Sequence, residues 1–205
     1  MKGAALRNDQ RFWVTTLVRG FLAVLTGSAI LILPDMARTI LLLPLALAIA
    51  ITGLAAYVVV DSTLVIVASF MPGSERARLA MRLQGVIGLL LGILLLSLYE
   101  RVQLEWFLSL AAIQSFSVGV AEIVIARHYS PTRRLWIWNY AAACIALLFC
   151  CIYVFLRVGW AERLTPRAVS WSLYAYLVAF GIAQCITAAR MLYADLRATT
   201  VTRQA

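Results

Sequence analysis

Six long apolar stretches, separated by short polar segments, constrain what this 205-residue chain can fold into. A helix needs about 20 residues to cross about 30 Å of hydrocarbon, and each stretch approaches that length. With 63% hydrophobic and 13% charged residues, the chain has too few polar side chains to cover a water-soluble globule. The sequence therefore predicts an all-α, polytopic bundle of six transmembrane helices, forming a single membrane domain over residues 1–205. The uncharged windows cover residues 20–34, 39–60, 83–99, 106–121, 135–156 and 168–189.

The basic residues predict how this bundle lies in the membrane. Of the 18 Lys and Arg residues, 13 fall on the side that holds both termini if the chain crosses six times. The other five are Arg38, Arg101, Arg157, Arg163 and Arg167. Because cytoplasmic segments are enriched in Lys and Arg, we expect an inner-membrane protein with both termini in the cytoplasm. The first apolar run continues past residue 29 to Leu33, so we expect it to stay as an uncleaved helix.

The net charge of +9 suggests a lipid partner rather than a nucleic acid. The basic residues do not gather into one patch interleaved with aromatic side chains, as a nucleic-acid module would require. We expect the cytoplasmic loops to hold anionic lipid headgroups. Tryptophans favour the membrane interfaces, and here Trp13, Trp136 and Trp138 fall near predicted cytoplasmic ends, and Trp106, Trp160 and Trp171 near predicted outer ends.

The chain has no catalytic motif of a common enzyme class. GxSxG, HExxH and Walker sequences are all missing, and no His and Glu pair is spaced for one helix face. The four cysteines have neither CxxC spacing nor a nearby His, so we expect them to be buried apolar residues rather than disulfide or metal partners. They are Cys144, Cys150, Cys151 and Cys185. We expect a protein that is not an enzyme and needs no cofactor or metal.

A helix-pair unit is repeated three times along the chain, over about 11–70, 79–127 and 135–192. In the first helices of units one and two, glycines recur seven residues apart, at Gly20 and Gly27 and at Gly85 and Gly92. In the second helices a small residue is followed three positions later by Val65, Glu122 or Gln184. Because each unit crosses the membrane twice, the repeats run parallel, unlike the inverted repeats of many transporters.

These motifs resemble one known family. The Arg19-Gly20 pair, the glycine seven residues later, Pro34, and a returning helix over residues 60–70 (Val-Asp-small-x-Leu-x-x-Val-Ala-x-Phe) are similar to the HdeD-like family of bacterial membrane proteins. The resemblance implies three helix pairs and a role in acid resistance, and it brings no catalytic signature. The chain departs from the pattern at Tyr99, where the second unit would carry a proline, and in its third unit, which lacks the Arg-Gly start. We also expect a long first connection, with Pro44 ending a short outer segment or kinking the second helix.

Three ionisable residues lie within or at the edge of the apolar stretches, where a charge is costly and marks a functional candidate. They are Arg19, Asp61 and Glu122. Arg19 and Asp61 fall at matching depth on adjacent antiparallel helices, so we predict an ion pair between them that either fixes the helices or belongs to a proton or ion path. We expect Glu122 to pair with Arg127 near the interface or to reach water. Convergence of Glu122, its repeat counterpart Gln184 and Asp61 on one cavity would indicate a proton-sensing site.

Glycines in the apolar stretches are expected to let helix backbones approach closely in lipid, within the chain or between copies of it. They are Gly20, Gly27, Gly85, Gly88, Gly92, Gly119 and Gly181, with Gly88 and Gly92 forming a GxxxG.

The sequence leaves three functions open. The resemblance implies a non-enzymatic role in acid or envelope stress. A small channel or transporter would use Arg19, Asp61 and Glu122 along a polar path, whereas a scaffold would act through helix contacts with partners. A polar cavity that reaches both faces would favour transport, and a dry interior with an exposed small-residue groove would favour the scaffold.

Overall fold

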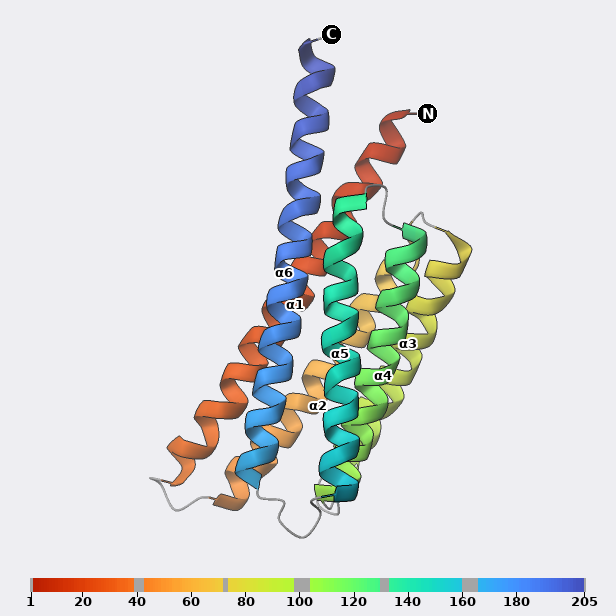
Figure 1. The fold of residues 1–205 in the computed structure, drawn as a ribbon. Helices are drawn as coiled ribbons and strands as arrows, with labels where there is room; N and C mark the ends of the chain where they lie inside the picture. The colour runs from red at the N-terminus through yellow and green to blue at the C-terminus, as the bar shows by residue number, and fades with distance from the viewer. Residues whose placement is uncertain are drawn as a thin grey trace.

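The computed structural model of the chain is all-helical over the residues that it describes, which are 2–38, 43–71, 74–97, 104–129, 133–159 and 166–204. Within these ranges there are six helices and no strand, as the sequence predicts (Figure 1). The helices are α1 (Lys2–Arg38), α2 (Leu43–Ala68), α3 (Glu75–Ser97), α4 (Leu104–Tyr129), α5 (Arg133–Gly159) and α6 (Pro166–Gln204).

The six helices form a closed ring in which each runs antiparallel to the next (Figure 1). Each helix contacts its successor, and α6 contacts α1. Both termini lie on one side of the bundle, which we call the terminal side, and the opposite side is called the far side. The most extensive packing joins α1 with α6, α4 with α5 and α2 with α3, and the predicted helix pairs pack less extensively. The repeat relationship between those pairs stays a prediction.

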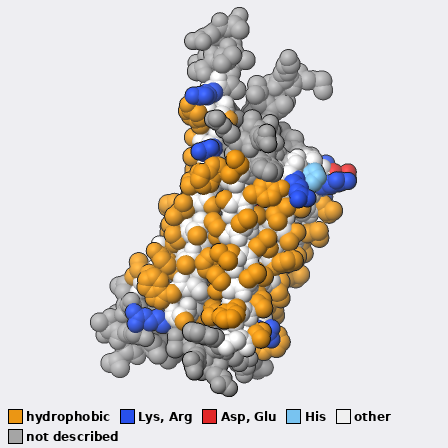
Figure 2. All heavy atoms as spheres, in the orientation of Figure 1, with side chains coloured by type: hydrophobic (Ala, Val, Ile, Leu, Met, Phe, Trp, Pro, Cys, Tyr) orange, Lys and Arg blue, Asp and Glu red, His pale blue; other side chains and the backbone are white. Residues whose placement is uncertain are grey.

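All six helices are long and apolar enough to cross a membrane. Their outward faces carry large apolar side chains, such as Phe21, Leu90 and Phe155, each more than half exposed. In the space-filling view these side chains form a broad band, and Lys and Arg lie near its two ends (Figure 2). An apolar belt of this extent is stable against lipid and not against water. The chain is a multi-pass membrane protein.

The glycines predicted to pack helices do so within the chain. A β-carbon at Gly20 would lie 2.7 Å from the carbonyl oxygen of Gly181, so α1 and α6 cross there with their backbones nearly touching. Gly85, Gly88 and Gly92 form a stripe on α3 that faces α2. Gly27 faces α6, and Gly119 faces α5. Because all seven positions meet another helix of the same chain, close glycine packing serves the ring itself. Contact between copies stays a prediction.

Three sequence predictions need correction. Cys144 and Cys151 are exposed, whereas Cys150 packs against the core and Cys185 lies against Gly20 of α1, and these two are only partly buried; all four are free. The first connection is short, since α1 runs to Arg38 and α2 begins at Leu43. Pro44 therefore lies in the first turn of α2, where a helix tolerates proline because no backbone N–H bond is lost.

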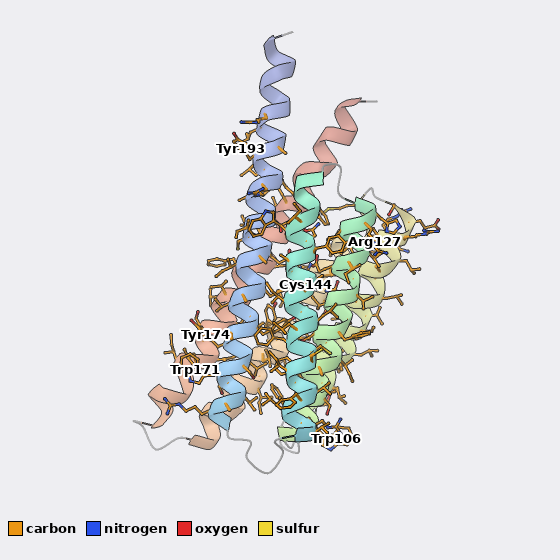
Figure 3. All side chains as sticks on the ribbon, viewed as in Figure 1. Trp106, Arg127, Cys144, Trp171, Tyr174 and Tyr193 are labelled. Carbon is orange, nitrogen blue, oxygen red and sulfur yellow. The ribbon has the colours of Figure 1, made fainter. Side chains whose placement is uncertain are left out.

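The tryptophans whose side chains are described lie near the ends of the apolar spans, as predicted, and which end faces the cytoplasm stays a prediction. Trp106 and Trp171 lie toward the far side, at the ends of α4 and α6 (Figure 3). On the terminal side, the guanidinium of Arg190 lies 5.2 Å from the ring centroid of Trp138, a cation–π contact. The side chains of Trp136 and Trp160 fall outside the described residues.

Candidate functional site: a buried charge cluster

Arg19 and Asp61 form the predicted ion pair inside the ring. Nε of Arg19 donates to Oδ1 of Asp61 at 2.7 Å, and Nη2 donates to Oδ2 at 3.3 Å. Arg19 is 6% exposed and Asp61 is 3% exposed, so the pair is shielded from bulk water. The two-pronged geometry matches the planar guanidinium to the carboxylate and fixes the rotation of α1 against α2.

Glu122 joins the same cluster, which corrects the prediction that it pairs with Arg127 or reaches water. It is 3% exposed, and its Oε1 accepts hydrogen bonds from Nη1 of Arg19 at 3.4 Å and from Nε2 of Gln184 at 2.7 Å. Arg127, five residues further along α4, instead donates from Nε to the hydroxyl of Tyr140 at 3.0 Å. Sequence spacing placed Glu122 close to Arg127 along the helix, but Glu122 lies on the face that turns into the ring, and Arg127 is exposed.

Close helix crossing brings the fourth member, Gln184, to this site. Gln184 lies three residues after Gly181 on α6, and Arg19 immediately precedes Gly20 on α1. Because these two glycines let the backbones of α1 and α6 nearly touch, the side chains beside them reach the same point in the ring. The cluster thus joins α1, α2, α4 and α6, and Gln184 is 2% exposed.

The charges of the cluster do not balance when all three groups are ionised. Arg19 supplies one positive charge, whereas Asp61 and Glu122 supply two negative charges, and Gln184 is neutral. A buried ion pair already loses much hydration free energy, and an additional uncompensated charge raises that cost further. Binding one proton at the cluster would remove this uncompensated charge.

Two internal cavities lie on opposite sides of the cluster. Toward the terminal side, a cavity of about 20 Å³ is lined by Arg19, Glu122, Gln184 and Asn139, and reaches Phe12 and Ala68 at the ends of the apolar spans. Toward the far side, a cavity of about 50 Å³ is lined by Asp61 together with aromatic and apolar side chains. The Arg19–Asp61 pair stands at the boundary, since Arg19 lines one cavity and Asp61 the other.

Three tyrosines at the far-side cavity were not identified from the sequence: Tyr57, Tyr153 and Tyr176. The hydroxyl of Tyr176 is hydrogen-bonded with Ser115, whereas the buried hydroxyl of Tyr153 has no partner within the part of the chain that the structure describes. Two of these tyrosines could have been identified from helical spacing. Tyr57 precedes Asp61 by four residues and Tyr176 precedes Gln184 by eight, so each tyrosine lies on the same side of its helix as a residue of the cluster. Within the described residues, no three His, Cys, Asp or Glu side chains gather as metal ligands.

Comparison of the chain with family models, with curated proteins and with solved structures gives no match. The resemblance to the HdeD-like family therefore rests on the sequence motifs alone.

Proposed function

We propose that this multi-pass membrane protein is not an enzyme, and that it takes up one proton at the cluster of Arg19, Asp61, Glu122 and Gln184 as part of acid or envelope-stress tolerance. The proposal rests on one observation: two buried carboxylates, Asp61 and Glu122, contact the same single cation, Arg19. A fall in pH supplies the proton that removes the excess negative charge. The acid-tolerance setting is what the HdeD-like resemblance implies.

The orientation that belongs to this proposal is an inner-membrane protein with both termini in the cytoplasm. It is supported by the excess of Lys and Arg on the terminal side. The far side, with the larger cavity next to Asp61, would then face the periplasm, where acid stress reaches a bacterium first.

The experiment is survival of an acid challenge by a deletion strain that carries wild type, Asp61→Asn or Glu122→Gln. Each single variant leaves one carboxylate for Arg19, so the cluster stays charge-balanced and membrane expression should be preserved. Glu75→Gln is the matched control, since it makes the same change at an exposed carboxylate in the first turn of α3. We expect rescue by wild type and the control but not by the cluster variants. Equal rescue by all four proteins would contradict a functional cluster.

A small proton channel or transporter is the second candidate, and the pair of cavities favours it. They approach the cluster from opposite ends of the bundle and are separated there by the Arg19–Asp61 pair. Proton flux into proteoliposomes with a pH-sensitive dye inside distinguishes the two candidates. Flux above that of empty liposomes, lost in Asp61→Asn, indicates transport, whereas proton uptake without flux indicates sensing.

A further inference from the structure

The far-side cavity is lined by two buried polar groups that lack a hydrogen-bond partner among the described residues, and water could supply one. Tyr153 is fully buried (0% exposed) and lines the cavity, yet its hydroxyl has no hydrogen-bond partner within the residues that the structure describes. The buried Oε1 of Gln114, which also lines the cavity, has none either. Buried polar atoms are nearly always hydrogen-bonded. A cavity of about 50 Å³ has room for water, because one molecule needs roughly 10–15 Å³ of such space.

The cavity runs from the charge cluster to the far-side ends of the helices. It begins at Asp61 and reaches Leu54, seven residues nearer the start of α2, which is about 10 Å at the rise of an α-helix. It also reaches Leu95, two residues before α3 ends, and Phe107, three residues after α4 begins. The cavity therefore extends from the cluster toward the far side of the bundle.

We propose that this cavity is a water-filled inlet that carries protons from the far side to Asp61, with its waters held by the Tyr153 hydroxyl and the Gln114 amide oxygen. That the cavity carries protons rests on the proposed function above. That it holds water does not depend on that function. A proton passes along the waters to a carboxylate of the cluster, which changes from an anion to a neutral acid. The waters are left neutral, and Arg19 keeps its charge.

The groups around Asp61 fit this task. Arg19 from α1 is its one charged contact among the described residues. Polar neighbours in the cavity come from α2, α4, α5 and α6, whereas α3 contributes apolar Leu91 and Leu95. The polar neighbours are Tyr57, Gln114, Ser115, Tyr153 and Tyr176. The ring centroids of Tyr153 and Tyr176 lie 6.3 Å apart in an edge-on arrangement, so two packed aromatic rings form part of the cavity wall.

Hydration is tested by radiolytic hydroxyl-radical labelling of the full chain in lipid, carried out in ¹⁸O-enriched water, because radicals made from a bound water oxidise the side chain beside it. We expect Tyr153 to be labelled. Phe155, two residues further along α5 and 62% exposed on the outward face, is the dry control and should stay unlabelled. An unlabelled Tyr153, with Tyr193 labelled on the terminal side, would show a dry cavity and overturn the inlet.

The proton role is tested by filling the cavity. Ala111→Leu adds volume at a cavity-lining position, and Ala56→Leu makes the same change on an exposed face of α2. In oriented proteoliposomes, infrared spectroscopy follows carboxylate protonation after an acid step on the far side. We expect Ala111→Leu to slow protonation by about tenfold or more, on the scale of a disrupted proton-transfer step, without changing its final extent. Ala56→Leu should behave as wild type.

The outcomes separate the inlet from the proposed function. Protonation at wild-type rate in Ala111→Leu, or faster protonation from the terminal side, overturns the inlet and leaves proton uptake standing. No protonation in any variant overturns proton uptake, and the labelling of Tyr153 then decides hydration by itself. If Ala111→Leu does not fold, Tyr153→Phe replaces it, because it removes the water-holding hydroxyl with little change in volume.

Discussion

Arg19 and Glu122 lie 103 residues apart in the chain, and Nη1 of Arg19 is 3.4 Å from Oε1 of Glu122 across the interior of the ring. Their helices, α1 and α4, are separated on both sides by two other helices of the ring and do not pack directly in any extensive way. The contact is therefore made by side chains that reach across the bundle. It turns a pair between neighbouring helices into a cluster that holds four helices.

Removing the cation of the cluster should destabilise the protein strongly. Arg19→Met leaves two buried carboxylates without a counterion, and breaking a buried pair in this way costs about 3–5 kcal/mol. The triple variant Arg19→Met/Asp61→Asn/Glu122→Gln leaves no buried charge and should recover most of that loss. The measurement is chemical unfolding in detergent micelles. A triple variant no more stable than Arg19→Met would argue against an electrostatic cause.

The crossing of α1 and α6 should not tolerate one added methyl group. Gly20→Ala places a β-carbon 2.7 Å from the Gly181 carbonyl oxygen, and such overpacking costs about 1–3 kcal/mol. Gly53→Ala is the control, because nothing lies within 4 Å of a β-carbon there. It should be neutral or stabilising by up to about 1 kcal/mol, since alanine favours helix. Thermal unfolding of both variants checks this, and equal losses would contradict it.

Gln184 should act as a neutral hydrogen-bond donor to Glu122. Gln184→Leu removes the 2.7 Å bond and should cost about 1–3 kcal/mol, the range for a buried acceptor that loses its partner. Gln184→Glu adds a third carboxylate, next to Glu122, and should destabilise more at neutral pH than at acid pH, where protonation relieves the repulsion. Unfolding measured at the two pH values tests both variants. A Gln184→Glu protein insensitive to pH would show that this side chain does not face the cluster.

The fold and half of the site could be predicted from the sequence. Hydropathy defines six helices because each must satisfy its own backbone in lipid. The Arg19–Asp61 pair follows from depth alone, because adjacent antiparallel helices meet at equal depth. The role of Glu122 could not be found this way, because its partner Arg19 lies on the opposite helix of the ring, and sequence spacing reports only neighbours along a helix. The same limit applies to Tyr153, which is a candidate because it lines the cavity and its hydroxyl has no hydrogen-bond partner in the described ranges.

Both termini should be found in the cytoplasm. Thirteen of the 18 basic residues lie on the terminal side, so a fluorescent protein fused to the C-terminus should mature and a phosphatase fused there should stay inactive. Fusions placed after Gly159, where α5 ends on the far side, should show the reverse. The opposite pattern would invert the orientation and place the Tyr153 cavity toward the cytoplasm.

Proton uptake by the cluster is tested most directly by infrared difference spectroscopy of the full chain in lipid between neutral and acid pH. Wild type should gain the carbonyl signal of one buried carboxylic acid. Asp61→Asn and Glu122→Gln should each lose that gain, because either substitution leaves Arg19 with a single carboxylate and no excess charge. A wild-type spectrum without the new signal, or one whose signal persists in both variants, would contradict proton binding at this cluster.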